Sequence, residues 1–108
     1  MKISEMEKAA EGVSDLMKVL CNKKRLMILC QLVEGEKSVG ELADLLDARR
    51  PAMSQQLALL RKDGLVRPRR DGQTIYYALA RRDVSALMTF LYRTYCGKDA
   101  STLIGDQE

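Results

Sequence analysis

Hydrophobic residues recur at helical spacing along most of the chain, and two such stretches between residues 38 and 64 are separated by only a short turn. The first begins at Ser38, which with Glu41 forms an S-x-x-E capping box, a signature of a helix N-terminus. The second begins near Pro51, because the missing N–H of proline is tolerated in the first turn of a helix. We therefore predict two short helices joined by a tight turn. Their apolar stripes are Val39, Leu42, Leu45 and Leu46 in the first and Met53, Leu57 and Leu60 in the second.

The polar face of the second helix carries no carboxylate before Asp63. Glutamine and arginine, which this face contains, form paired hydrogen bonds with adenine and guanine edges in the major groove. We therefore expect a DNA-reading helix-turn-helix; the alternative is an ordinary helical hairpin with a solvated face. The outward positions are Pro51, Gln55, Ala58 and Lys62, flanked by Arg50, Ser54 and Arg61.

Residues 65–70 and 73–79 look like two strands on either side of Asp71-Gly72. This dipeptide predicts a hairpin with a type I′ turn, which needs positive φ at both central residues. A basic hairpin directly after a recognition-like helix predicts a winged helix whose tip lies along phosphates or enters the minor groove; a charged hairpin can also be a solvated edge. Ile75, Tyr77 and Leu79 are expected to face inward, Thr74, Tyr76 and Ala78 outward, and Arg67, Arg69 and Arg70 to crowd the tip.

Two further apolar stripes occupy the ends of the chain, and both come close to a heptad seam. A core of this size covers only part of such stripes, so we expect a homodimer that pairs the first and last helices. A two-fold dimer places its recognition helices about one DNA turn apart, which implies double-stranded DNA with an inverted-repeat operator. The stripes are Met6, Ala9, Ala10, Val13, Leu16, Met17 and Leu20, and, after a cap at Asp83, Val84, Leu87, Met88, Leu91, Tyr92 and Tyr95.

The composition of the 108 residues, with 46% apolar and 31% charged side chains, is that of one globular domain. The net charge of +3 is modest, but cations crowd residues 49–70, which favours a nucleic-acid partner. No stretch is apolar enough for a membrane span, so we expect a cytoplasmic protein. The sequence has no histidine, and we find neither a phosphate-binding glycine loop nor a catalytic carboxylate pair; no enzyme activity and no cofactor are expected. We expect one domain over residues 1–97, followed by a flexible tail at 98–108.

A helix is predicted over residues 23–35, ending at Gly35, and it contains the motif Arg25-Leu-Met-Ile-Leu. Together with Ser54-Gln55-Gln56-Leu57 and the wing segment 69–77, this motif resembles the arsenic-repressor-like (ArsR-type) winged-helix transcriptional repressors. The resemblance runs from about Met6 to Cys96. It implies a mainly α fold of five helices, with a small β-hairpin wing before the last helix and dimerisation through the first and last helices. The expected DNA-binding residues are Arg50, Ser54, Gln55, Gln56, Lys62, Arg67, Arg69, Arg70, Gln73 and Tyr76.

The family divides by what its members sense. Metal-sensing members carry a cysteine pair in the helix that corresponds to residues 39–46, where this chain has none, so a typical metal site is not expected. Cys21, Cys30 and Cys96 remain, and each is either a small core residue or a reactive thiol. The chain is similar to the sulfide- and persulfide-responsive branch, in which cysteines at the positions of Cys30 and Cys96 are linked by a disulfide or polysulfide bridge. That similarity implies reactive sulfur species as the inducer and release of DNA.

The chain departs from the family pattern at residues 21–23, where Cys21-Asn22-Lys23 replaces the usual Ser-His-Pro. Cys21 is then inert, or a resolving thiol, or the third ligand of an arsenite or antimonite site. Gln56 and the pair Arg49-Arg50 also depart from the pattern and predict a shifted or more salt-dependent operator preference. Persulfide and peroxide both remain candidate signals, and a winged helix used only for protein contacts is a further alternative.

Overall fold

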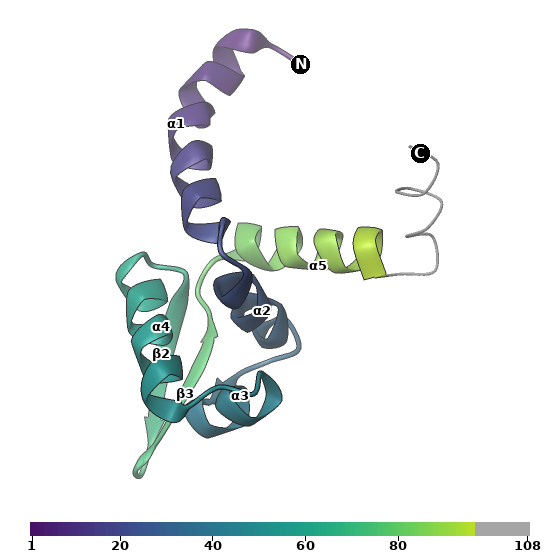
Figure 1. Ribbon diagram of the computed structural model, residues 1–108. Helices are drawn as coiled ribbons and strands as arrows, with labels where there is room; N and C mark the ends of the chain where they lie inside the picture. The colour runs from purple at the N-terminus through teal and green to yellow at the C-terminus, as the bar shows by residue number, and fades with distance from the viewer. Residues whose placement is uncertain (97–108) are drawn as a thin grey trace.

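The computed structural model describes residues 1–96 and consists of five helices and three short strands (Figure 1). The predicted tail at 98–108 lies outside the described residues. The expected mainly α fold with a hairpin before the last helix is confirmed. In chain order the elements are α1 (Ile3–Leu20), α2 (Lys23–Leu32), β1 (Lys37–Ser38), α3 (Val39–Leu45), α4 (Arg50–Lys62), β2 (Val66–Asp71), β3 (Thr74–Leu79) and α5 (Arg82–Cys96).

Helix α2 begins at a side-chain cap, because Asn22 accepts a hydrogen bond from the backbone N–H of Arg25 at 3.2 Å. It ends at Leu32, three residues before the predicted end at Gly35. The backbone turns there: Gly35 has a φ of 140° and donates its N–H to the carbonyl of Leu32 at 3.2 Å. A side chain is strained at such a φ, which is why glycine occupies this position.

A two-residue strand that the sequence pattern did not reveal joins the helix-turn-helix to the wing. The antiparallel sheet has the order β1-β3-β2, and β1 pairs Lys37 with Tyr77 and Ser38 with Tyr76. Ser38 also caps α3: its hydroxyl accepts from the N–H of Glu41, and the Glu41 carboxylate accepts from the N–H of Ser38. The predicted capping box is confirmed, and α3 therefore starts on the strand that holds the wing.

The turn of the wing differs by one residue from the prediction. Asp71 pairs with Thr74, so the central residues are Gly72 and Gln73, not Asp71 and Gly72. Gly72 has a φ of 63°, whereas Gln73 is not among the described residues with positive φ. One positive φ at the first central position fits a type II′ turn and excludes type I′. Type I′ and type II′ turns both match the twist of the flanking strands. The pairing of Asp71 with Thr74 adds one residue pair between β2 and β3.

The core lies where α2, α3, α4 and α5 meet the sheet. The predicted inward residues of α4 are confirmed, since Met53, Leu57 and Leu60 are all buried. The prediction for Leu45 is wrong: 57% of this residue is exposed. Helix α3 buries the arc that includes Leu42 and Ala43, and at 3.6 residues per turn Leu45 falls outside that arc.

Only part of the apolar surface of the terminal helices α1 and α5 is buried within the chain. Helix α1 buries Leu16 and Leu20 near its end, and Figure 1 shows the rest of it projecting from the body of the molecule. Helix α5 buries Val84 and Met88 on one side. The apolar residues left exposed on these helices are Ile3, Met6, Val13 and Met17 of α1 and Phe90, Tyr92 and Tyr95 of α5.

Candidate nucleic-acid interface and thiol pair

The outer face of α4 is an exposed polar surface on a rigid helix. The turn before it is held by Asp47, which has a φ of 52°, and Pro51 lies in the first turn of the helix. Burial of Met53, Leu57 and Leu60 orients the helix and leaves the opposite face in solvent. Four of the predicted DNA-binding residues lie exposed on this helix, namely Arg50, Ser54, Gln55 and Lys62.

Arg50 rests against the neighbouring helix α3. A Cβ atom on Gly40 would lie 2.6 Å from Nη2 and 3.0 Å from Cζ of Arg50, so only glycine lets this guanidinium lie where it does. The side chain therefore lies across the first turn of α3 at the N-terminal end of α4. This geometry places one cation at the start of the recognition helix.

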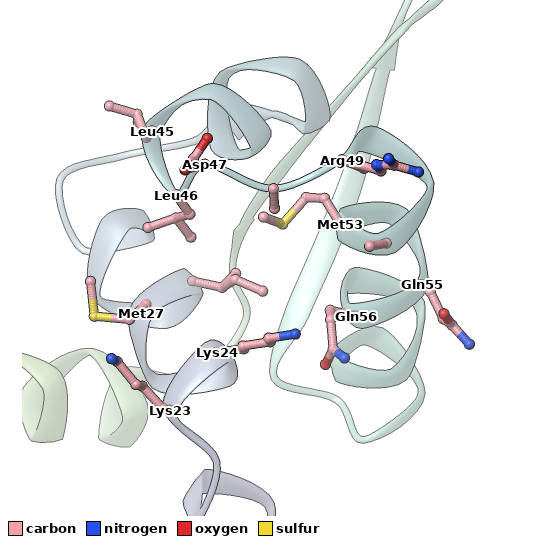
Figure 2. Close-up of a pocket in the computed structure, with 13 residues that line it drawn as sticks. Lys23, Lys24, Met27, Leu45, Leu46, Asp47, Arg49, Met53, Gln55 and Gln56 are labelled. Atoms are coloured by element: carbon pink, nitrogen blue, oxygen red, sulfur yellow. The ribbon is translucent and has the colours of Figure 1, made fainter.

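Gln56 differs from the other predicted DNA-binding residues of α4. It is half-buried, and its Oε1 is buried without a hydrogen-bond partner. Figure 2 shows Gln56 facing Lys24 of α2, whereas Gln55 points away from α2. A rotation of about 100° per residue separates the two glutamines, so they cannot share one face. Gln56 therefore lies off the outward face that Gln55 occupies, and its role in DNA binding stays a prediction.

Arg67, Arg70 and Gln73 of the wing are exposed. Arg69 is also exposed, but its guanidinium binds other side chains of the same chain. The Arg69 guanidinium donates three hydrogen bonds of 2.5 to 3.1 Å to the carboxylate of Glu36. Its Cζ also lies 4.8 Å from the centroid of the Tyr76 ring, directly across the strand pair. The Arg69 hydrogen bonds lower the pKa of Glu36. Arg69 and the half-buried Tyr76 therefore hold the wing against the loop before β1, and the role of Arg69 in DNA binding stays a prediction.

A recess of about 670 Å³ lies between the start of α2, the turn before α4, and α4 itself (Figure 2). Its buried lining residues Ile28 and Met53 are apolar, while the exposed residues around it include Lys23, Lys24 and Arg49. Sequence reasoning did not assign the two lysines, because they precede the helix-turn-helix. The run Lys23-Lys24-Arg25 was the available signal.

The two predicted sensing thiols lie on helices that pack together. Cys30 is half-buried on α2, with its Sγ 3.6 Å from the Sδ of Met88 on α5. Burial raises the pKa of the Cys30 thiol, and the nearby Cys96 thiol raises it further. Cys96, the last residue of α5, is exposed. Both are free thiols here, so Cys30 is shielded and Cys96 is accessible.

The contact of Cys30 is with Met88, eight residues before Cys96, which corresponds to roughly 12 Å along a helix axis. A direct disulfide between the two thiols needs their Cα atoms within about 7 Å of each other. Cys21 is exposed at the end of α1. Within residues 1–96, no three His, Cys, Asp or Glu side chains are placed to hold a metal ion. The three thiols are thus not gathered within one protomer.

Comparison with known proteins identifies relatives that cover most of the chain. The family model described as bacterial regulatory protein, arsR family, matches residues 22–67. The transcriptional activator HlyU of Vibrio cholerae is 45% identical over 96 residues, which are 89% of this chain and 89% of HlyU. The structure of reduced HlyU from that organism has a TM-score of 0.80 and covers 87% of this chain and 99% of its own.

Two further solved structures are similar. The transcriptional repressor BigR of Xylella fastidiosa is 43% identical, with a TM-score of 0.83, and the match covers 89% of this chain and 98% of BigR. The homodimeric winged helix-turn-helix domain Mb0332 of Mycobacterium bovis is 31% identical, with a TM-score of 0.67 and 84% of each chain covered. Separately, none of the helices over residues 1–96 has the length and apolar character of a membrane span.

Proposed function

The chain belongs to the arsR family of DNA-binding transcriptional regulators, and from this premise we propose that it is a dimeric repressor that releases its operator when Cys30 and Cys96 become linked. The observation that carries the proposal is the placement of the thiols. Cys30 is held on α2 against α5, and Cys96 is exposed at the end of α5. In this proposal the chain acts in the cytoplasm as a binding protein and not as an enzyme.

The DNA-reading surface is the exposed face of α4 together with the free part of the wing. Gln55 and Arg50 have the donors and acceptors that read base edges, while Arg67, Arg70 and Lys62 neutralise phosphates. In our proposal Arg69 and Tyr76 position the wing, since Glu36 already binds the guanidinium of Arg69.

The partner that completes the molecule is a second copy of the chain. The exposed apolar side chains of α1 and α5 support this, as does the homodimeric state of Mb0332. A two-fold dimer sets the recognition helices about 34–36 Å apart, so the proposed operator is an inverted repeat with that spacing.

The sensing chemistry begins at the accessible thiol. The Cys96 thiolate attacks the outer sulfur of a small-molecule hydropersulfide, forming Cys96–S–SH and releasing the small-molecule thiolate. The Cys30 thiolate then attacks the Cys96 sulfur of that group and expels HS⁻, which leaves a disulfide. If Cys30 is also a persulfide, its terminal sulfur attacks in the same way, and a trisulfide forms with loss of HS⁻. Neither route needs a further oxidant.

We propose that the bridge contains an inserted sulfur. A disulfide requires Cα atoms within about 7 Å of each other, whereas each inserted sulfur extends the reach by about 2 Å. Cys30 lies beside Met88, roughly two turns before Cys96, and the longer reach of a trisulfide suits this separation along α5. Either bridge draws the dimer helix α5 against α2, and α2 leads through β1 into α3 and α4. We propose that this movement changes the spacing of the recognition helices and weakens operator binding.

The experiment is intact mass and peptide mapping of the reduced protein after treatment with glutathione persulfide or with peroxide, alongside binding to a duplex selected from a random library. We expect a Cys30–Cys96 peptide with an inserted sulfur after persulfide, together with loss of binding. C30S and C96S should abolish both effects, whereas the control C21S should retain them. No cross-link with either reagent would overturn the proposal. Loss of the response in C21S would favour the metalloid alternative with three thiols.

A further inference from the structure

The recess beside α4 is a cationic site that the DNA-reading face described above does not use. Its lining includes Lys23 and Lys24 from the first turn of α2 and Arg49 from the residue before α4. All three are exposed, and none is among the ion pairs formed within residues 1–96. One carboxylate, that of Asp47, lies among the lining residues. The site therefore keeps a net positive charge and favours an anion.

The apolar lining of the recess strengthens this preference. The buried Ile28 and Met53 line the recess beside the cations, and apolar surroundings reduce the screening of nearby charges. Gln56 adds a polar group, because its buried Oε1 lacks a hydrogen-bond partner. Figure 2 shows Lys24 pointing toward Gln56, and both residues line the recess.

The position of the recess identifies the anion as a phosphate of the DNA backbone. Gln55 lines the recess and also belongs to the exposed face of α4, so the recess borders the surface that reads bases. A helix in the major groove, which is about 12 Å wide, has a row of phosphates on each side. None of the residues that line the recess comes from the wing, so this site and the wing contact different phosphates.

We propose that Lys23, Lys24 and Arg49 form a second phosphate-binding site, which takes a backbone phosphate beside the half-site. This inference rests on the proposed DNA binding and extends its footprint to α2. The site adds affinity that does not depend on sequence, and it makes operator binding more sensitive to salt than α4 and the wing alone would.

The test compares K23Q/K24Q with the matched control K2Q/K8Q, which removes the same charge from the region around α1. Fluorescence anisotropy on the selected duplex and on a random-sequence duplex gives the dependence of log Kobs on log salt. The slope should become less steep by about 0.9 for each phosphate lost, hence by about 2 for one phosphate on each protomer of a dimer. The shift should be equal on both duplexes, and the control should retain the slope of the wild type. Circular dichroism confirms that each variant is folded.

A second arm locates the phosphate. Neutral methylphosphonates replace single phosphates around the half-site. One substitution should weaken the wild type and the control but leave K23Q/K24Q unaffected, and R49Q should lose the same contact. If K23Q/K24Q matches K2Q/K8Q in slope and at every neutralised position, the inference is wrong while DNA binding stands. If the wild type shows no salt-dependent binding to either duplex, the proposed function fails, and this inference fails with it.

Discussion

The helix-turn-helix with its wing and the terminal helices α1 and α5 differ in how they cover their apolar residues. In α4, Met53, Leu57 and Leu60 are all buried by the same chain. In α5, Phe90 is 59% and Tyr92 64% exposed, and α1 leaves Met6, Val13 and Met17 exposed. Burial of apolar area is the main stabilising term in folding, and the chain itself provides this burial for the first region but only in part for the second.

The boundary between the two regions is the contact of α2 with α5. Cys30 lies on the self-contained side of this contact, and its partner Met88 belongs to the helix that carries the exposed aromatic residues. In the proposed mechanism, a bridge from Cys30 to Cys96 acts at this contact and transmits a change in α5 to the DNA-reading helices. The proposed sensor therefore lies at the contact of α2 with α5 and not in either region alone.

The largest expected effect comes from breaking the self-contained region. Leu57 is 0% exposed, and Leu57→Ala removes buried methyl groups and leaves a cavity. We expect a loss of about 3 kcal/mol in the free energy of unfolding, measured by urea denaturation. The control Leu59→Ala lies on the same helix at 41% exposure and should cost far less. Equal losses in the two variants would contradict the description of this core.

The next effect tests the incomplete region. Tyr92→Asp places a charge in the exposed apolar face of α5, and we expect the dimer Kd to rise by about 100-fold, or about 2.7 kcal/mol, because a buried unpaired charge is costly. Sedimentation velocity measures the change, and circular dichroism should report retained helix. The control Leu45→Glu, on the exposed side of α3, should leave the dimer intact. An unchanged Kd in Tyr92→Asp would remove α5 from the interface.

A smaller expected effect concerns the reactivity of the two thiols on α2 and α5. Burial raises the pKa of Cys30, so less of it is thiolate at neutral pH, and its contact with Met88 hinders access. We expect iodoacetamide to alkylate the exposed Cys96 about tenfold faster than Cys30, with Cys30 labelling rising at higher pH than an ordinary cysteine. Labelling at timed intervals followed by mass spectrometry gives both rates. Faster labelling of Cys30 would reverse the proposed order of attack.

The smallest effect concerns the wing. Glu36→Gln removes the charge that binds Arg69, and because the pair is exposed we expect Tm to fall by only about 1 °C at pH 7. The pKa of Glu36 is lowered from its ordinary value of 4.5, so its contribution to stability is present above that pH and is lost as the pH falls through the lowered value. The difference in Tm between wild type and variant should narrow below pH 4.5. A difference that widens in acid would contradict the ion pair. The comparison variant is Glu41→Gln. The Glu41 carboxylate caps α3, and glutamine keeps a side-chain oxygen that can accept the N–H of Ser38.

Local rules account for the parts of the fold that the sequence predicted. The capping box of Ser38 and Glu41 and the buried stripe of α4 depend on residues within a few positions of each other, and both are confirmed. The wrong predictions have causes outside their own segment. Leu45 follows the helical period, but the core that meets α3 is too narrow to reach it. The turn at Gly72-Gln73 follows the register of β2 against β3, which the favoured Asp71-Gly72 dipeptide cannot specify.

The candidate site shows the same division between what local sequence determines and what tertiary contacts determine. The sequence alone established a basic helix-turn-helix with a wing and two thiols in a family pattern, because residue type, spacing and periodicity suffice for these. The directions of individual side chains depended on contacts between segments far apart in the chain. Arg69 is engaged because Glu36 lies across the sheet from it, and Gln56 faces Lys24 because α2 and α4 line the same recess. Cys30 is shielded because α5 presents Met88 to it, a contact between residues 58 positions apart that no local pattern encodes.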